Sequence, residues 1–321
     1  MAQSLFKALK QQQPDVSIDV LAPGWSLPLL QRMPEVADAI DMPLGHGELK
    51  LAARRLLGKS LRGQGYRQAI VLPNSLKSAL IPFWARIPRR TGYVGEMRYG
   101  LLNDARRLDK QQLPMTVQRF AALGQRKDAT LPAAVQAPSL SVSDESVEHA
   151  LSRLQLHKPG DKLLVLCPGA EFGEAKRWPA RYYAEVAKQS HQQGWQVWLF
   201  GSEKDQLVTA SINQLAGNCC TDLAGKTRLA EAIDLMSLAD VVISNDSGLM
   251  HVAAALNKSL VAIYGSSDPG FTPPLNPEAK ILRLGLDCSP CFKRECPLGH
   301  LNCLEGLKPD KVFMAMGIEP L

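Results

Sequence analysis

The residues of this chain that are best suited to chemistry lie between positions 244 and 256. Asp246, Ser247 and Gly248 follow an apolar run, and His251 comes within one helical turn of them. A helix that begins here would present free N–H groups and a partial positive charge, which suit a diphosphate. Asp246 or Ser247 can cap the helix, and Gly248 lets a ligand approach the backbone. The segment predicts a phosphate site; the alternative is a capped helix with a packed histidine.

Two further loops follow predicted strands and should face the same edge. One contains the adjacent cations Lys176 and Arg177, which either neutralise a leaving phosphate or are simply solvated. The other ends in Asp205, whose carboxylate suits a ribose hydroxyl, although a plain helix start explains it nearly as well. Both loops are therefore candidates for the nucleotide side of a site.

Four late cysteines form a separate cluster: Cys288, Cys291, Cys296 and Cys303, with His300 among them. A C-x2-C pair with two more cysteines and a histidine can supply four zinc ligands, although the spacing is not that of a standard finger. A structural zinc ion, a disulfide pair and free thiols all stay open. Disulfides are the least favoured of these in a reducing cytosol.

The elements that must position these residues are clearest in the second half. Apolar runs at 162–167, 195–200, 240–244 and 259–265 predict strands, and the stretches between them predict helices. Alternating apolar strands and helices are typical of a parallel sheet that is covered on both faces. Ligands of such a sheet lie beyond the carboxyl ends of its strands.

The first half follows similar rules. Runs at 17–22, 68–73 and 91–95 predict strands, 75–84 a helix, and 1–13 an opening helix. Ala, Pro and Ser at 126–143 indicate a linker. We therefore expect an α/β chain with two Rossmann-like parallel-sheet domains that face a cleft, spanning residues 1–145 and 146–321.

The composition is that of an ordinary globular chain, with 45% hydrophobic residues and a net charge of +6. The first residues lack the apolar run of a signal peptide, so we expect a cytosolic protein. Seven cations lie between Arg86 and Lys110. They either attract phosphorylated substrates or an anionic membrane, or form a solvated loop. Nucleic acid is disfavoured, because no binding motif accompanies the charge.

Five segments carry a resemblance to a known family: 72–80, 95–104, 168–179, 245–256 and 271–275. Over essentially its whole length the chain resembles the inverting heptosyltransferases of lipopolysaccharide core synthesis, glycosyltransferase family 9. The resemblance implies a GT-B fold and transfer of L-glycero-D-manno-heptose from ADP-heptose to the first heptose of heptosyl-Kdo2-lipid A. It also implies transient contact with the cytoplasmic face of the inner membrane. We expect no cofactor for the chemistry, since fixed cations and amides can replace a metal.

The resemblance also assigns residues. Lys176 is expected at the donor phosphates, where it stabilises the leaving group, Asp205 at the adenosine ribose and Thr227 at the adenine. Asp246, Ser247, Gly248 and His251 are expected to hold the diphosphate and heptose. The candidates for the acceptor side are Asn74, Ser75, Lys77 and Arg98.

One departure from the family concerns the start of the chain. The family opens with a strand and a Gly-Asp loop whose aspartate acts as general base, and no segment before Ala2 corresponds to them. We therefore expect the first strand to be missing, and no general base is found in this chain. The alternatives are a truncated, inactive sugar-nucleotide-binding remnant and a related GT-B enzyme that uses another donor, such as a UDP-sugar.

Overall fold

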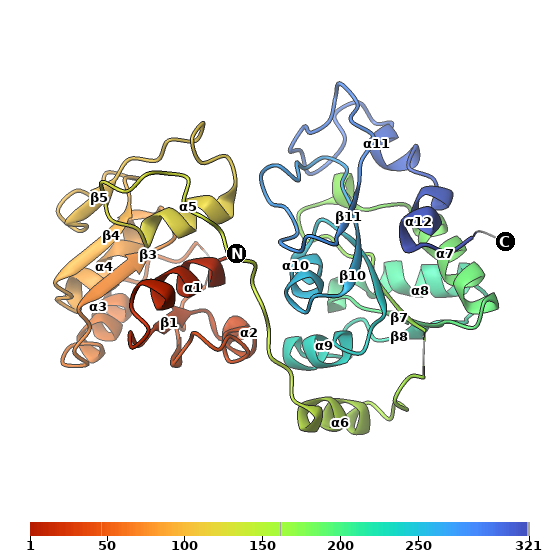
Figure 1. The fold of residues 1–321 in the computed structure, drawn as a ribbon, viewed down its shortest axis with the longest axis horizontal. Coiled ribbons are helices and arrows are strands. Elements are labelled where there is room, and N and C mark those ends of the chain that lie inside the picture. Colours follow the sequence, from red (N-terminus) through yellow and green to blue (C-terminus); the bar gives the residue numbers. More distant parts are fainter. Residues whose placement is uncertain (46, 161, 320–321) are drawn as a thin grey trace. The chain divides into compact units, whose positions relative to one another are not determined.

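The computed structural model describes residues 1–45, 47–160 and 162–319 (Figure 1). The chain divides into two compact units. The first comprises Met1–Leu27 and Glu35–Gln136, and the second comprises Pro28–Pro34 and Ala137–Leu321. The division at 136 falls inside the expected linker. The expected boundary after residue 145 falls within α6 (Asp144–Arg153), a helix of the second unit.

The second unit is built on one six-stranded parallel sheet in the order β11-β10-β9-β6-β7-β8. Its first strand, β6, lies in the interior, with later strands added on both sides. The strands are β6 (Leu163–Cys167), β7 (Gln196–Leu199), β8 (Thr221–Asp222), β9 (Val241–Asn245), β10 (Ser259–Ile263) and β11 (Lys280–Leu282). The four strands predicted for this half are confirmed to within a few residues, and the short strands β8 and β11 were not predicted.

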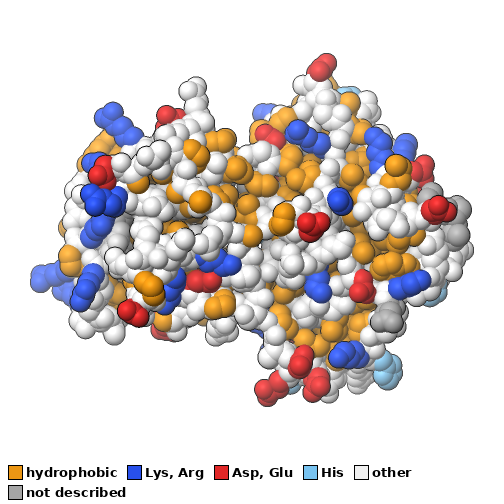
Figure 2. All heavy atoms as spheres, in the orientation of Figure 1, with side chains coloured by type: hydrophobic (Ala, Val, Ile, Leu, Met, Phe, Trp, Pro, Cys, Tyr) orange, Lys and Arg blue, Asp and Glu red, His pale blue; other side chains and the backbone are white. Residues whose placement is uncertain are grey.

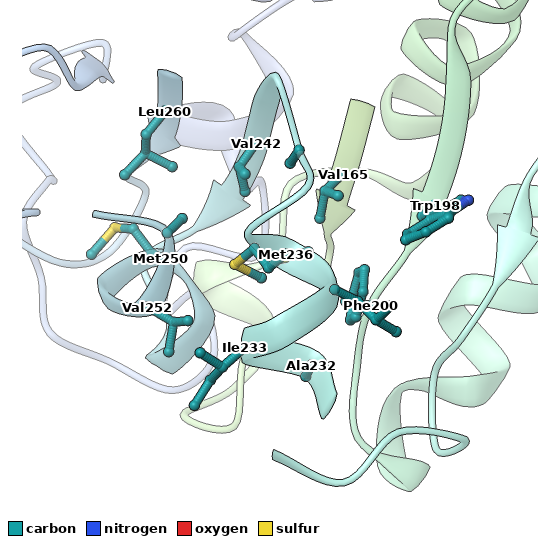
Figure 3. Packing of buried hydrophobic residues seen from close by; sticks show 14 of the residues in the cluster. Val165, Trp198, Phe200, Ala232, Ile233, Met236, Val242, Met250, Val252 and Leu260 are labelled. Carbon is teal, nitrogen blue, oxygen red and sulfur yellow. The ribbon is translucent and has the colours of Figure 1, made fainter. Parts of the chain in front are cut away.

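Helices cover both faces of this sheet because successive strand side chains alternate between them. Val165 and Val242 pack with α6, α9 (Leu229–Met236) and α10 (Gly248–Ala255), and Figure 3 shows this layer. Leu166 and Ile243 point to the other face. The helices there are α7 (Ala180–Gln192), α8 (Gln206–Leu215) and α12 (Pro309–Met316), and α11 (Asn302–Glu305) joins them near the C-terminus. Each fully buried Leu, Ile or Val contributes about 1.5–3 kcal/mol.

The first unit is also built from parallel strands, as expected. Its parallel strands form two separate ladders in the described residues. One ladder joins β1 (Asp19–Ala22) to β2 (Asp38–Asp41), and the other joins β3 (Gln68–Val71), β4 (Arg89–Tyr93) and β5 (Asp104–Arg106). The hydroxyl of Tyr66 donates to Asp19 Oδ2 at 2.6 Å and thereby links the start of β1 to the segment that leads into β3.

The helices of the first half are short. They are α1 (Gln3–Gln12), α2 (Leu27–Leu30), α3 (Leu51–Ser60), α4 (Leu76–Trp84) and α5 (Thr116–Leu123). The expected helices at 1–13 and 75–84 are confirmed as α1 and α4. In α4 the backbone N–H of Leu76 donates to Glu96 Oε2 at 2.7 Å, which satisfies one free group of the first turn. None of the described helices is both long and apolar enough to cross a membrane.

Candidate functional site

The strand order of the second unit defines a switch point between β6 and β9. Chain connections run outward from this position in both directions, and such a point leaves a crevice beyond the carboxyl ends of the strands. The segment after β6 leads to Lys176 in the short 3-10 helix η2 (Glu174–Lys176), and the segment after β9 leads to Asp246. The two loops singled out from the sequence therefore meet at the edge where a ligand is expected.

Lys176 and Asp246 form an ion pair across this switch point. Lys176 Nζ lies 2.5 Å from Asp246 Oδ2, and the side chains are only 17% and 5% exposed. The ammonium also lies 5.1 Å from the ring centroid of Phe172, within the range of a cation–π contact. The pair places a positive charge beyond the strand ends, in surroundings where screening by water is reduced.

Asn245 holds the two strand ends together. Its side chain is fully buried. Nδ2 donates to the carbonyl of Pro168 at 2.7 Å, while Oδ1 accepts from the backbone of Trp178 and from the hydroxyl of Tyr183, each at 3.1 Å. Because these partners come from the loop after β6 and from α7, Asn245 fixes the spacing around the ion pair. The site prediction did not include it; its only sequence signal is its place at the end of β9.

The helix that follows β9 begins without a side-chain cap in the described structure. Ser247 is the N-cap residue of α10, but its side chain makes no cap hydrogen bond in the described structure; its Oγ lies 3.2 Å from Ser244 Oγ. The space beside the Gly248 Cα is empty. Asp246 pairs with Lys176 instead of capping, so of the two predicted caps only Ser247 takes that position. The first N–H groups of α10 are thus available to an anion.

His251 lies one turn into α10 and is half-buried. Burial lowers the pKa of its imidazole. The ring is therefore neutral at pH 7 and can donate through one nitrogen and accept through the other.

A buried hydroxyl at the neighbouring strand end adds to the site. Ser267 follows β10, is 6% exposed, and its Oγ finds no partner among the described residues. Buried polar groups are rarely left without a hydrogen bond, so an unsatisfied one calls for a ligand or water. The site prediction did not include Ser267; the available signal was a glycine and two serines directly after a strand.

The two expected nucleoside contacts lie at the neighbouring strand ends. Asp205, after β7, is nearly buried; its Oδ2 accepts from the N–H and the hydroxyl of Ser202, at 2.9 and 2.8 Å. A role at the start of a helix thus accounts for Asp205 Oδ2 only. Asp205 Oδ1 lies 3.9 Å from Arg177 Nη2. Thr227 lies beyond β8, in the turn before α9.

The four acceptor candidates lie in the first unit. Asn74 is exposed and Ser75 is the N-cap of α4. Lys77 Nζ donates to the carbonyl of Glu48 at 3.3 Å. Arg98 is 1% exposed, and its guanidinium donates to the carbonyls of Pro73 and Ser75, at 2.6 and 3.2 Å. Arg98 therefore supports the backbone around Asn74 and Ser75, while its buried Nε finds no partner among the described residues.

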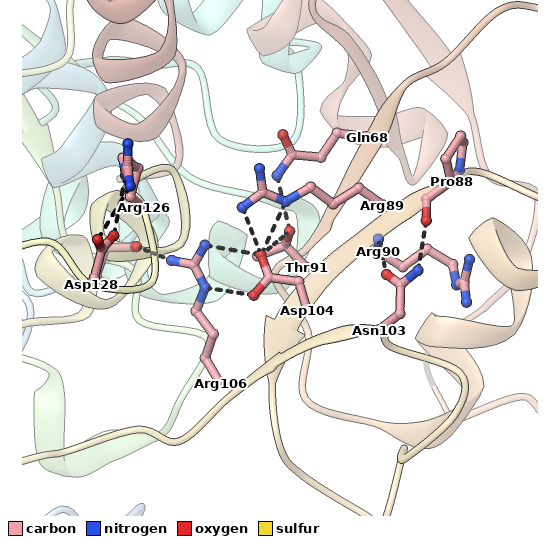
Figure 4. Close-up of polar contacts among 11 residues, drawn as sticks. Gln68, Pro88, Arg89, Arg90, Thr91, Asn103, Asp104, Arg106, Arg126 and Asp128 are labelled. Atoms are coloured by element: carbon pink, nitrogen blue, oxygen red, sulfur yellow. Dashed lines mark hydrogen bonds and ion pairs between the residues drawn. The ribbon is translucent and has the colours of Figure 1, made fainter.

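The basic stretch from Arg86 to Lys110 separates into structural and exposed cations. Asp104 accepts hydrogen bonds from Arg89, Arg106 and Thr91 (Figure 4). Burial raises the pKa of Asp104, but these hydrogen bonds outweigh it and lower the pKa to about 2. Arg86, Arg107 and Lys110 stay exposed. Figure 2 shows Lys and Arg side chains gathered on the side of this unit that carries α3, α4 and β5.

None of the seven cysteines, all of which the structure describes, forms a disulfide. In the described parts of the chain no three His, Cys, Asp or Glu side chains form a ready-made metal site.

Comparisons with known proteins agree with this geometry. The sequence profile of Glycosyltransferase family 9 (heptosyltransferase) matches residues 54–302. Lipopolysaccharide heptosyltransferase 2 of Salmonella typhimurium is 49% identical over 98% of this chain and 92% of its own length. The Escherichia coli protein of the same name is 47% identical over the same shares. The solved structure of E. coli ADP-heptose lps heptosyltransferase II superposes with a TM-score of 0.87, at 44% identity, over 98% of this chain and 93% of that one. The chain is therefore a glycosyltransferase with the α/β fold of the GT-B heptosyltransferases, and it belongs to glycosyltransferase family 9.

Proposed function

We propose that this chain transfers L-glycero-D-manno-heptose from ADP-heptose to the first heptose of the lipopolysaccharide inner core. The observation that carries the proposal is the Lys176–Asp246 pair at the switch point, beside the open N-terminus of α10. The near full-length similarity to heptosyltransferases 2 supports the choice of donor and acceptor. It also disfavours the alternative of an inactive sugar-nucleotide-binding remnant.

The second unit supplies the leaving-group half of the reaction. The acceptor hydroxyl attacks the anomeric carbon from the face opposite ADP and gives up its proton to solvent, the bond from that carbon to the diphosphate oxygen breaks, and the configuration inverts. Negative charge then grows on the diphosphate. Lys176 and the first N–H groups of α10 are fixed where they stabilise that charge. Asp246 orients the ammonium, and neutral His251 offers a hydrogen bond to the donor.

We assign the nucleoside and the acceptor to residues at the remaining strand ends. Asp205 is proposed to contact the ribose through Oδ1, and Thr227 to lie by the adenine. In the first unit, Asn74, Ser75 and Lys77 are proposed to face the acceptor, with Arg98 in a positioning role. No catalytic metal is assigned, because Lys176 and the amides of α10 supply the positive charge that the departing diphosphate needs.

The acceptor is a lipid, so we also propose contact with the cytoplasmic face of the inner membrane. Helix α3 exposes Leu51 and Leu56 together with Arg55 and Lys59. Exposed leucines with flanking cations suit an anionic membrane surface. Sedimentation with phosphatidylglycerol vesicles tests this part, with Leu56→Glu expected to weaken binding and phosphatidylcholine vesicles expected to bind less protein.

The decisive experiment is a transfer assay with ADP-heptose and an acceptor that carries a single heptose. We expect one heptose to be added, and ADP to bind more tightly than UDP in a calorimetric titration. Asp246→Asn preserves side-chain size and leaves Ser247 as the N-cap, so the fold should persist while transfer falls strongly. A rate equal to that of the unmodified protein would remove Asp246 from the site, and binding of UDP in preference to ADP would favour another sugar nucleotide.

A further inference from the structure

The four late cysteines are brought to one place by the fold. Cys288, Cys291, Cys296 and Cys303 line a single cavity in the second unit, together with His300. Cys303 belongs to α11, whereas the other three lie in the irregular segment between β11 and α11. The remaining cysteines, Cys167, Cys219 and Cys220, lie elsewhere in the unit. This convergence does not follow from the C-x2-C spacing alone, because it also needs α11 to pack beside Gly265.

The four sulfurs line one small cavity, so thiolates there would be crowded together. Crowded thiolates repel one another unless a cation compensates their charge. A bound metal ion replaces the thiol protons and supplies that positive charge.

An unsatisfied hydroxyl in the same cavity gives a second, independent observation. Ser266 lines it, is 1% exposed, and its Oγ has no partner among the described residues. A buried hydroxyl beside four thiols can donate to a metal-bound sulfur, as outer partners of metal ligands commonly do. His300 is less suited as a ligand, because its Nδ1 already accepts from the backbone N–H of Asn302 at 3.0 Å.

The cysteine segment, residues 288–303, is hydrogen-bonded to the backbone next to Lys176. Ala175, the preceding residue, also lines the cavity. Its N–H donates to the carbonyl of Arg294 at 3.0 Å, and its carbonyl accepts from Ser266 at 3.1 Å. The N–H of Phe292 in turn donates to the carbonyl of Ser266 at 2.7 Å. Backbone hydrogen bonds thus connect three parts of the chain: the cysteine segment, the residues after β10, and η2.

Side chains reinforce these connections. The guanidinium of Arg294 lies 5.5 Å from the ring centroid of Phe172, whose ring also contacts the Lys176 ammonium. The backbone of Arg294 passes so close to Gly173 that a Cβ there would lie 2.4 Å from the Arg294 carbonyl oxygen. The cysteine segment therefore packs directly against the loop that carries Lys176.

We propose that Cys288, Cys291, Cys296 and Cys303 bind one thiophilic divalent cation, Zn²⁺ or Fe²⁺, and that the bound ion fixes the loop that holds Lys176. The four sulfurs match the tetrahedral, all-cysteine ligand set of structural sites, and soft thiolates select these metals. The thiols line the cavity without forming a ready-made ligand set in the described residues, so binding draws the irregular segment inward. The second half of the proposal rests on the proposed role of Lys176; the metal site itself does not.

The first test measures metal in the full chain, purified under reducing conditions. We expect about one Zn²⁺ or Fe²⁺ per chain by inductively coupled plasma mass spectrometry. The metal should be lost in Cys288→Ser/Cys291→Ser and kept in the matched control Cys219→Ser/Cys220→Ser. Co²⁺ added to the metal-free wild type should give the visible bands of a tetrahedral thiolate complex, a readout that needs no variant to fold. Absence of metal together with absence of these bands would overturn the site, as would metal retained in the double variant.

The second test measures ADP binding by calorimetry before and after a chelator removes the metal. Loss of a positioned Lys176 should weaken ADP binding about tenfold, the effect of losing one hydrogen bond to a charged group. Zn²⁺ should restore it, and Lys176→Met should be insensitive to the chelator. Unchanged ADP affinity after complete metal removal would overturn the link to Lys176, whereas failure of heptosyl transfer with normal metal content would count against the proposed function alone.

Discussion

Two polar clusters of this protein carry similar charges but differ in their hydrogen bonding. In the second unit, Lys176 and Asp246 meet beyond parallel strands, next to an open helix terminus, and the hydroxyl of Ser267 at a neighbouring strand end has no partner among the described residues. In the first unit, Asp104 lies among Arg89 and Arg106, and the buried Arg106 also donates to the carbonyl of Ala122 at 2.7 Å. Both clusters pair cations with a carboxylate. Unused hydrogen-bonding capacity, and not charge, separates a ligand site from a structural network.

The largest effect should come from removing the cation of the cluster in the second unit. Lys176→Met should lower kcat roughly 10²- to 10³-fold, because it deletes the fixed charge that we propose stabilises the leaving diphosphate. Lys204→Met is the matched control, since Lys204 pairs with Glu171 on the surface of the same unit. Steady-state assays with ADP-heptose measure both. Equal losses in the two variants would mean that general charge, and not the switch-point geometry, matters.

Changes to the cluster in the first unit should alter the free energy of unfolding and leave ADP binding unchanged. Asp104→Ala leaves Arg106 without its carboxylate and should cost about 3 kcal/mol in the free energy of unfolding. ADP affinity should stay unchanged, because the proposed donor residues all lie in the second unit. Asp128→Ala, which removes an exposed pair with Arg126, should cost less than about 0.5 kcal/mol. Urea titrations and calorimetry distinguish the outcomes; a weakened ADP affinity in Asp104→Ala would contradict the separation of roles.

The same carboxylate predicts a pH dependence. The pKa of Asp104 is lowered from 3.8 to about 2 in the folded chain, so its contribution to stability is present above pH 3.8 and is lost as pH falls through about 2. The contribution is roughly 2 kcal/mol. Unfolding measured between pH 5 and 2 should show a shallower acid dependence in Asp104→Asn than in the wild type. If the free energies of unfolding of the two proteins fell in parallel with pH, Asp104 would not be the source of the acid dependence.

The smallest effect should come from the unpartnered hydroxyl. Ser267→Ala should weaken ADP binding by roughly 1 kcal/mol, the net value of one hydrogen bond, while the unliganded protein keeps its stability. Removing a buried hydroxyl that lacks a partner carries little penalty in the folded chain. Calorimetry with ADP and thermal unfolding of the free protein measure the two quantities. Lower stability without weaker binding would show that Ser267 belongs to the fold and not to the site.

Much of the second unit could be predicted from the sequence. Apolar runs that end at glycine, proline or capping residues located β6, β7, β9 and β10, and the same reasoning placed Lys176 and Asp246 in loops at one sheet edge. These signals are local, since a buried parallel strand needs a continuous apolar run and a helix start needs a polar residue. The first unit was less predictable because its strands are short and only partly buried, so β2 and β5 carry weak periodicity.

The sequence by itself thus determined the fold class, the family and the loops that carry Lys176 and Asp246. Only the tertiary structure decided which candidates share a site. Lys176 and Asp246 are seventy residues apart and meet because β9 pairs with β6 in the sheet. Arg98 is an acceptor candidate by resemblance, and only the structure shows that its guanidinium is buried against the carbonyls of Pro73 and Ser75. The four cysteines share a cavity only because α11 packs beside the end of β10. Burial and hydrogen-bond partners are properties of distant residues brought together, and local patterns do not encode them.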